Sequence, residues 1–446
     1  MSTENIASSR EQRAEQNDFA TVRIPPNKRR SSFVVSTILI GFCIAMSGLF
    51  AGAELSRGLS PMTAIGASLL GNLILVIYAG LCGVIGTREG VSTAMLLRHP
   101  FGRNGSRFIS AIFAFTLVGW YSWQSGFFGN TINAMFPGGG VITNPQVAAV
   151  WGGLAMMISA YHGIKGLTVL NIIAVPLLLI ASIVGTILAV NLAGGWQGMM
   201  ELPVEGPIDF QTAVVMVVGA FAVGGVIQSD ITRYSKTPFV SMVATVIAFI
   251  GAHSFVLVAG YLMGMASGTT NVAMAMLQVI GVWSLLVLIT AQWTTNDNNL
   301  YSSSLALSNI FKVPKKRIVL VLGTVASISA AFGLADMFVG WLVFLGVSIP
   351  PVAGILIADY YFISKRKYNF AEGTRYGSVS ITAFSSWLIA SIAGFNIAWG
   401  IQSINAVVIS FAAYLVIDNL FRKMGWKRFI GKEHVELEDG NTKVVE

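Results

Sequence analysis

Long apolar stretches alternate with short polar ones along most of the 446-residue chain. An apolar stretch of about 20 residues crosses a hydrocarbon core of about 30 Å as an α-helix. Scanning for such stretches predicts an all-α membrane protein with about twelve transmembrane helices. They lie near residues 33–53, 61–86, 106–135, 146–162, 168–193, 210–229, 238–265, 274–309, 317–335, 337–362, 378–396 and 399–421.

The composition agrees with this pattern. Hydrophobic residues make up 54% of the chain and charged residues only 11%, whereas soluble domains carry roughly 25% charged residues. A water-soluble fold is therefore excluded. The net charge of +8 could suggest a nucleic-acid partner, but the basic residues gather beside the ends of the apolar stretches. We expect the lipid bilayer, and no nucleic acid, as a partner, and the sequence leaves the oligomeric state open, with a monomer possible.

The basic residues also predict the orientation. Loops after even-numbered spans carry residues such as Arg88, Lys236 and Arg366, whereas the loops after odd-numbered spans hold Arg57 and acids such as Glu54. The positive-inside rule then places both termini in the cytoplasm of a multi-pass protein of the cell (inner) membrane. Residues 1–30 and 423–446 are predicted to be cytoplasmic tails around a transmembrane domain at 31–422. The N-terminal tail lacks the features of a removable signal peptide.

Glycines lie near the middle of the first and sixth spans, including Gly41 and Gly48 in one and Gly219 and Gly225 in the other. Glycine permits a helix to unwind, and unwound backbone inside a membrane is tolerated where it lines a cavity. Close helix packing is the alternative for either span alone. Their matching positions favour two inverted halves of five spans, near 33–193 and 210–362, with accessory helices near 378–421.

The eighth span is unusually polar between Gln292 and Ser304. On a helix, positions 291, 294, 295, 298 and 302 share one face. The Ala291 carbonyl and the hydroxyls of Thr294 and Thr295 would therefore offer hard oxygen donors to a small cation. The alternative is that both hydroxyls bond back to their own helix. Asp297 is either a proton-carrying group or a buried acid held by its neighbours.

The third span places Gln124 one helical turn after Trp120. An indole ring and an amide on one face suit a flat heterocycle. For Trp123 we expect a packing or anchoring role. His253, in the seventh span, is expected to be a hydrogen-bonded packing residue, with proton relay as the alternative.

Several motifs resemble those of bacterial cytosine permeases in the nucleobase:cation symporter-1 family. They are Gly119-Trp120, Trp293-Thr294-Thr295-Asn296-Asp297-Asn298-Asn299-Leu300-Tyr301, Phe338-Val339-Gly340-Trp341-Leu342, and Ile349-Pro350-Pro351 with Ile357-Ala358-Asp359-Tyr360. The resemblance implies a five-plus-five inverted-repeat, LeuT-like fold with two accessory helices. It also implies import of a nucleobase-like ring coupled to sodium or protons.

Carried over to this sequence, the resemblance implies that Trp120 stacks on one face of the ring and Phe221 closes the other. It implies a sodium site made by the carbonyls of Gly41, Ile44 and Ala291 and the hydroxyls of Thr294 and Thr295.

The chain also departs from the cytosine permeases. Ala220 and Val223 replace hydroxyl residues, and Ala291 replaces an amide. A site that lacks hydrogen-bonding partners discriminates strongly against the original ligand. Gln124 matches an amide of hydantoin-type members, and Gln292 and Asn296 are further candidates for polar contacts. The three replacements therefore argue against simply assigning cytosine as the substrate.

We therefore expect a secondary active transporter that imports a nucleobase or related planar heterocycle (cytosine, purine or similar) by alternating access. A symporter for amino acids or amines on the same scaffold is one alternative, and a channel is another. No enzyme motif, phosphate-binding loop or paired-histidine metal motif is present, so we expect no catalytic activity and no cofactor beyond the coupling cation, sodium or proton.

Overall fold

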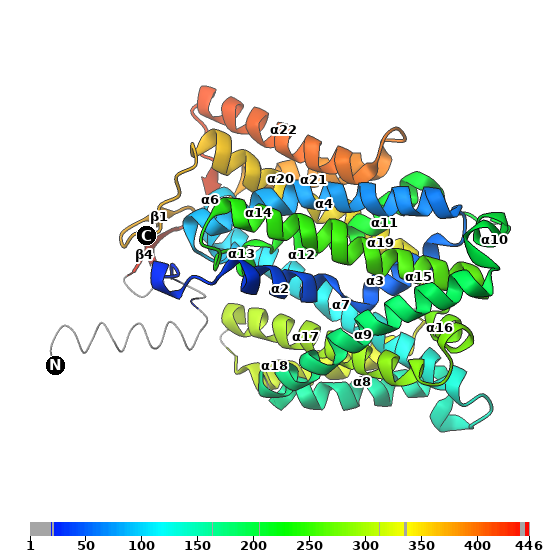
Figure 1. The fold of residues 1–446 in the computed structure, drawn as a ribbon. Coiled ribbons are helices and arrows are strands. Elements are labelled where there is room, and N and C mark those ends of the chain that lie inside the picture. Colours follow the sequence, from blue (N-terminus) through cyan, green and yellow to red (C-terminus); the bar gives the residue numbers. More distant parts are fainter. Residues whose placement is uncertain are drawn as a thin grey trace.

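The structure is a computed structural model that describes residue 19 and residues 22–162, 164–204, 206–311, 313–333, 337–437 and 442–445. Its long helices run side by side, and loops join them at the two ends of the bundle (Figure 1). The start of α2 (Ser32–Cys43) and the strand β4 (Glu433–Glu436) lie at the same end. Most of the N-terminal tail predicted for residues 1–30 falls outside the described residues.

The helices follow the predicted apolar stretches. In chain order they are α2 with α3 (Met46–Leu55), α4 (Pro61–Glu89), α7 (Arg103–Met135), α8 (Pro145–His162), α9 (Ile164–Leu192), α11 (Phe210–Ala220) with α12 (Ala222–Val226) and α13 (Ser229–Thr232), α14 (Pro238–Val246) with the π-helical η3 (Ile247–His253) and α15 (Ser254–Ser267), α16 (Val272–Ile280), α17 (Ser284–Phe311), α18 (Lys315–Ala330), α19 (Phe338–Ser348) with α20 (Pro350–Ala358) and the π-helical η5 (Asp359–Ile363), α21 (Ile381–Asn396) and α22 (Gln402–Lys423).

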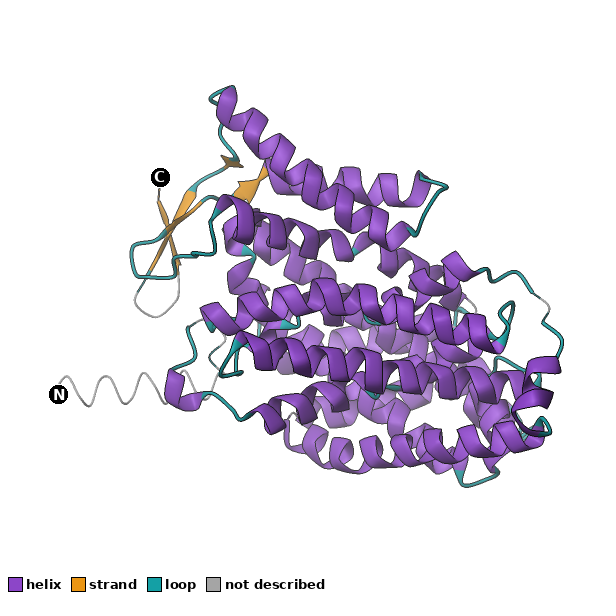
Figure 2. Ribbon diagram, turned by 45° about the horizontal axis from the view of Figure 1, so that its top comes forward, coloured by secondary structure: helices purple, strands orange, loops and turns teal. Residues whose placement is uncertain are grey.

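Short elements occupy the connections. They are η1 (Pro26–Lys28), α5 (Thr93–Leu96), α6 (Arg98–Phe101), η2 (Val141–Thr143), α10 (Gly195–Glu201), and the strands β1 (Arg375–Tyr376), β2 (Val379–Ser380), β3 (Phe429–Ile430), β4 and β5 (Thr442–Val445). Figure 2 shows that the strands gather at one end of the helical bundle.

One predicted span is wrong. The stretch 274–309 was expected to be a single helix, but it divides into α16 and α17 around Gly281. Gly281 has φ 88°, a left-handed conformation that glycine adopts without steric cost and that ends a helix. The predicted boundary between the ninth and tenth spans, at residues 334–336, lies outside the described residues.

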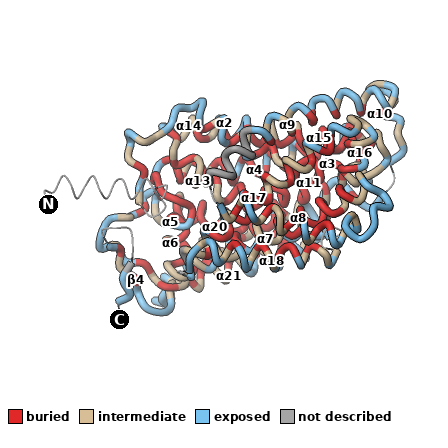
Figure 3. Tube along the Cα trace, turned by 90° about the horizontal axis from the view of Figure 1, so that it is seen from below, coloured by how far each residue is buried: buried red, intermediate tan, exposed pale blue. Residues whose placement is uncertain are grey.

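The outer surface of the bundle suits a lipid environment. Large apolar side chains point outward from several helices, including Ile77, Phe115, Ile187 and Leu388, each more than half exposed. Figure 3 shows buried residues concentrated along the inner parts of the helices. Among the described residues, five helices are long and apolar enough to cross a membrane. The α2–α3 pair, which is bent by 50°, would make a sixth.

Close backbone contacts hold helices together inside the bundle. A Cβ atom added at Gly52 of α3 would lie 1.9 Å from the Leu257 carbonyl oxygen of α15. A Cβ atom at Gly260 of α15 would lie 2.1 Å from the Leu49 carbonyl oxygen. Only glycine allows this approach, which is a common way to pack helices inside a membrane.

The C-terminal segment, predicted as a tail, contains strands that pair with one another and with an earlier connection. β3 pairs with β2, and β4 pairs with both β1 and β5, so the segment is bound to the connection between η5 and α21. Arg98 of α6 and Glu436 of β4 form a salt bridge of 2.9 Å, and their side chains are only 4% and 1% exposed. This buried pair anchors the segment to the end of the bundle.

We predict that Glu436→Gln lowers stability. Removing one partner of a buried ion pair leaves the other charge uncompensated, which costs about 3–5 kcal/mol. Thermal unfolding of the purified protein in detergent should show a clear fall in Tm. Glu433→Gln is the matched control, since Glu433 pairs with Arg375 at 3.5 Å with both side chains more than half exposed. Equal Tm values for the two variants would contradict the anchoring role.

Candidate functional site

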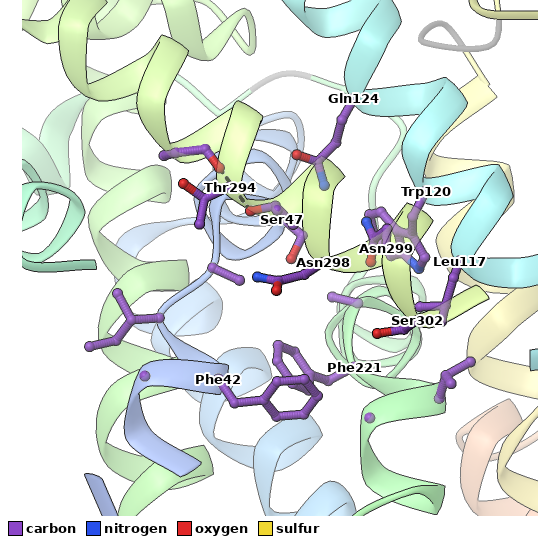
Figure 4. Close-up of a pocket in the computed structure, with 18 of the residues that line it drawn as sticks. Phe42, Ser47, Leu117, Trp120, Gln124, Phe221, Thr294, Asn298, Asn299 and Ser302 are labelled. Atoms are coloured by element: carbon purple, nitrogen blue, oxygen red, sulfur yellow. Dashed lines mark hydrogen bonds between the residues drawn. The ribbon is translucent and has the colours of Figure 1, made fainter. Parts of the chain in front are cut away.

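A cavity of about 200 Å³ lies where two broken helices face α7 and α17. The first broken helix is α2–α3, and the second is α11–α12. Figure 4 shows the cavity with Trp120 and Gln124 entering from α7 and with Phe42 and Phe221 on the opposite side. Side chains of α17, including Asn298, lie between them.

The break between α2 and α3 frees two carbonyl oxygens. In an unbroken helix the amide of Ala45 would donate to Gly41, and that of Gly48 to Ile44. Here the Ala45 amide donates to Cys43 at 3.0 Å, and the Gly48 amide donates to Ala45 at 3.0 Å. The carbonyls of Gly41 and Ile44 therefore lose their usual helical donors, and both residues line the cavity.

Gly41 and Gly48 serve different purposes in this helix pair. No atom lies within 4 Å of a Cβ built at Gly41, because this residue faces open space. A Cβ at Gly48 would lie 3.0 Å from Val256, so Gly48 allows α3 to pack against α15. The chain unwinds at Ile44 and Ala45, between the two glycines.

The second break falls at Phe221, between α11 and α12. Phe221 has φ −129° and ψ 17°, outside the helical range, and its ring faces the cavity. Gly219 does not create this break. A Cβ there would lie 1.9 Å from the Leu342 carbonyl oxygen, so Gly219 is needed for the contact between α11 and α19.

Helix α7 presents one aromatic and one amide group to the cavity. Trp120 is held by edge contacts with Trp123 and Phe338, at centroid distances of 5.6 and 6.2 Å. Trp123 itself stacks on Phe338 at 3.9 Å, which confirms its packing role. Gln124 is 0% exposed, and neither its amide oxygen nor its amide nitrogen has a hydrogen-bond partner among the described residues. A buried group without partners is costly, so Gln124 is available for a ligand.

Helix α17 presents hydroxyl groups beside the first break. The Thr294 hydroxyl donates to the Thr290 carbonyl at 2.5 Å, and the Thr295 hydroxyl donates to the Ala291 carbonyl at 2.9 Å. These are the bonds to their own helix that we considered as the alternative. They direct each hydrogen toward the helix and leave oxygen lone pairs for a cation. The Ala291 carbonyl is less available to a cation than the two hydroxyl oxygens, because it already accepts a hydrogen bond from the Thr295 hydroxyl.

The cavity brings together all the residues predicted for the site except Gln292 and Asn296. The residues that line it are Gly41, Ile44, Trp120, Gln124, Ala220, Phe221, Val223, Ala291, Thr294 and Thr295. Gln292 instead donates to the Thr131 hydroxyl at 3.2 Å, and Asn296 donates to the Ser125 hydroxyl at 3.1 Å. Both amides face α7 because their positions lie on a different side of α17. The structure therefore offers no support for their contact with a solute.

Further polar residues line the cavity that the sequence reasoning did not assign to it. They are Ser47, Asn298, Asn299 and Ser302. The signal for Asn298 and Ser302 was present, since both share the α17 face of Ala291 and Thr295. Ser47 had no comparable signal, because its position depends on the bend after Ala45.

Two buried polar residues near the site have specific partners. Asp297 accepts a hydrogen bond of 2.6 Å from the Ser159 hydroxyl, which also accepts one of 2.7 Å from the Trp293 indole. His253 forms a 2.7 Å hydrogen bond with Asn72. Hydrogen-bonded packing, the role expected for His253, agrees with this contact.

A cavity that is enclosed by apolar helices and lined by the free carbonyls of broken helices is typical of membrane carriers. Residues 23–421 match the family model described as permease for cytosine/purines, uracil, thiamine, allantoin. The cytosine permease of Escherichia coli (strain K12) is 31% identical over 424 residues, covering 95% of this chain and 99% of that protein. The hydantoin permease of Microbacterium maritypicum is 25% identical over 381 residues, covering 76% and 74%.

The fold has a solved counterpart. Mhp1, a nucleobase-cation-symport-1 family transporter in a closed conformation with bromovinylhydantoin bound, gives a TM-score of 0.74 at 19% identity. The match covers 92% of this chain and 96% of that one. The chain thus has the fold of a helical membrane transporter. It belongs to the family of permeases for cytosine, purines, uracil, thiamine and allantoin, and it is a membrane transport protein and not an enzyme.

The different roles of the glycines give a test of the geometry. We predict that Gly219→Ala destabilises the protein by about 1–3 kcal/mol, because the added methyl group would overlap the Leu342 backbone. Gly41→Ala should retain wild-type stability, since its methyl group would enter open space. Thermal unfolding in detergent compares the two. A stable Gly219→Ala variant would show that α11 and α19 do not pack this closely.

Proposed function

We propose that this protein imports a nucleobase or related planar heterocycle by symport with a cation, sodium or proton, through alternating access. The observation that carries the proposal is the cavity in which Trp120, Phe221 and the unpartnered amide of Gln124 meet. Aromatic faces favour a flat ring, and the amide of Gln124 offers N–H donors and an acceptor oxygen in the same plane. A heterocycle with adjacent N–H and C=O groups satisfies both.

The rest of the lining narrows the class of solute. The side chains of Ala220 and Val223 supply no hydrogen bonds, so the polar side-chain contacts come from Gln124, from Ser47 and from the α17 side, where Asn298 and Asn299 lie. The relatives are named for cytosine and for hydantoin, and both compounds are flat, polar rings. The amide at Gln124 favours a lactam-containing ring. The apolar side chains of α11–α12 disfavour a solute that needs hydrogen bonds on the edge facing these helices.

The coupling cation is proposed to bind beside the solute, at the break between α2 and α3. The freed carbonyls of Gly41 and Ile44 and the hydroxyls of Thr294 and Thr295 line the same cavity. Carbonyls of unwound helices are the donors that cation-coupled carriers use for sodium. One cation at this position would touch both α2–α3 and α17, so its binding would favour the arrangement in which these helices approach each other.

We also propose the number of membrane-spanning helices, their repeat and their orientation. We infer twelve transmembrane helices in two inverted halves of five with two accessory helices, in a cell inner membrane with both termini cytoplasmic. The two breaks, in α2–α3 and α11–α12, support the corresponding positions of the first and sixth spans. The shared end of α2 and β4 supports a common side for the termini.

A symporter for amino acids on this scaffold is the main rival. A free amino acid carries an ammonium and a carboxylate group, and burying these charges requires partners of opposite charge or helix ends. Among the residues that the structure describes, those that line the cavity include no ionisable side chain. The ends of α3 and α12 at the two breaks can receive charged groups, so the preference for a neutral heterocycle rests on the rings of Trp120 and Phe221 and on the amide of Gln124.

We predict that Trp120→Ala weakens binding of the transported heterocycle by roughly 5- to 150-fold. Stacking of a base on an aromatic side chain contributes about 1–3 kcal/mol. Equilibrium binding of radiolabelled cytosine, uracil, hypoxanthine and hydantoin to the purified protein measures the change. Trp399→Ala is the control, because Trp399 is 75% exposed and is not one of the described residues that line the cavity. If both variants bind like the wild type, the cavity is not the solute site.

For the cation, we predict that Thr295→Ala reduces the stimulation of solute binding by sodium, because one oxygen donor is lost. Thr290→Ala is the matched control. Its hydroxyl also bonds back to α17, to the Leu286 carbonyl at 2.7 Å, but Thr290 does not line the cavity. Sodium titrations of ligand binding distinguish the two. Unchanged sodium stimulation in Thr295→Ala would remove the assignment of this cation site.

A further inference from the structure

The ring of Phe221 faces the cavity and is held by contacts with several neighbouring residues. Phe42 contacts it edge-on with a centroid distance of 5.1 Å. A Cβ atom built at Gly224 would lie 2.6 Å from Cδ1 of Phe221, so only glycine leaves space for the ring. Phe249 and His253 complete the support, at centroid distances of 5.5 and 4.7 Å. The orientation of Phe221 therefore depends on these neighbours.

Phe249 and His253 both come from a π-helical turn. Residues Ile247–His253 form η3, which interrupts the span between α14 and α15. A π-helical turn inserts an extra residue into a helix, and such turns occur frequently at functional sites. The rings of Phe249 and His253 are both 0% exposed, and this turn brings both of them to Phe221.

The imidazole of His253 is held in one orientation by Asn72 of α4. The Asn72 amide nitrogen donates to the Ser68 carbonyl at 2.9 Å and to the Ser254 hydroxyl at 3.0 Å. These bonds use both amide hydrogens, so the Asn72 oxygen must face His253. It accepts the 2.7 Å bond from Nδ1. His253 therefore carries its hydrogen on Nδ1, and the network fixes the plane of the ring.

Nε2, the other ring nitrogen of His253, lacks a hydrogen bond of this kind. It is buried and has no hydrogen-bond partner among the described residues. Leaving a buried acceptor unsatisfied costs about 1–3 kcal/mol. The same ring also lies beside the first break, because a Cβ at Gly48 would be 3.6 Å from His253 Cδ2. His253 thus contacts the regions of both broken helices, at a cost to stability.

We propose that His253 is a positioning residue that holds the ring of Phe221 against the cavity and thereby sets which planar solutes the cavity accepts. Asn72 fixes the imidazole, and the imidazole limits the tilt of the Phe221 ring. This inference rests on the proposed function, because it assigns Phe221 to the solute site. A ring free to tilt would lose its fit to a flat solute while the surrounding helices stayed folded.

The position of the ring can be tested without a solute. Phe221 is replaced by 4-fluorophenylalanine, and the ¹⁹F NMR spectrum is recorded for the full chain in detergent. His253→Leu should shift and broaden the resonance, because the edge contact is lost. Gln228→Leu is the matched control. It removes a buried hydrogen bond of 2.9 Å to Thr245 of α14, and Gln228, like His253, is 0% exposed.

An unchanged resonance in His253→Leu would overturn the proposal, and so would an equal change in Gln228→Leu. If His253→Leu does not fold, His253→Gln replaces it in the same experiment. A glutamine side chain retains a donor for Asn72 but lacks the ring, so the same shift and broadening are expected. Unchanged spectra would again overturn the proposal.

A double-mutant cycle tests the consequence for binding. His253→Leu should raise the Kd for radiolabelled cytosine, uracil or hypoxanthine by about fivefold or more, within the range of couplings between contacting residues. In a Phe221→Leu background the same substitution should change the Kd by less than about twofold. Equal effects in the two backgrounds would show that His253 does not act through Phe221. If the wild type binds neither these bases nor hydantoin, the proposed function fails, while the ¹⁹F result still decides the role of His253.

Discussion

Unpaired backbone groups inside a membrane must be enclosed by protein, and the arrangement of this transporter depends on that constraint. The carbonyls of Gly41 and Ile44 have lost their helical donors at the break between α2 and α3. They cannot face lipid, so α7, α11–α12 and α17 surround them. The enclosed space is the cavity, and its polar character follows from the same oxygens that made the enclosure necessary.

The helices around this cavity are held by contacts that leave little freedom. Gly52 and Gly260 bring α3 and α15 into backbone contact, and Gly219 does the same for α11 and α19. The buried network of Asn72, Ser254 and His253 links α4 to α15 and to the π-helical turn. These contacts position Phe221 and the first break relative to each other. A solute and a cation that bind between them would therefore contact helices that are closely packed against their neighbours.

The sequence allowed much of this arrangement to be predicted, because the apolar stretches and the helical face of α17 depend on local periodicity. Trp120 and Gln124 were found together because they are one turn apart on one helix. The missed features depend on geometry that periodicity does not encode. Gly281 interrupts a stretch that is mostly apolar on both sides of it. Gln292 and Asn296 are polar like Asn298, but they bond to α7. The mid-span glycines were expected to mark the breaks, whereas the backbone unwinds at Ile44, Ala45 and Phe221.

Gradient-driven uptake by the purified protein in proteoliposomes tests the central claim most directly. Radiolabelled cytosine, uracil, hypoxanthine and hydantoin are supplied outside, with an inward sodium gradient, an inward proton gradient or neither, and an amino-acid mixture serves as competitor. The account predicts that at least one heterocycle accumulates above its external concentration when one gradient is present, and that amino acids do not compete. Failure of every heterocycle to accumulate, or uptake that neither gradient increases, would contradict it.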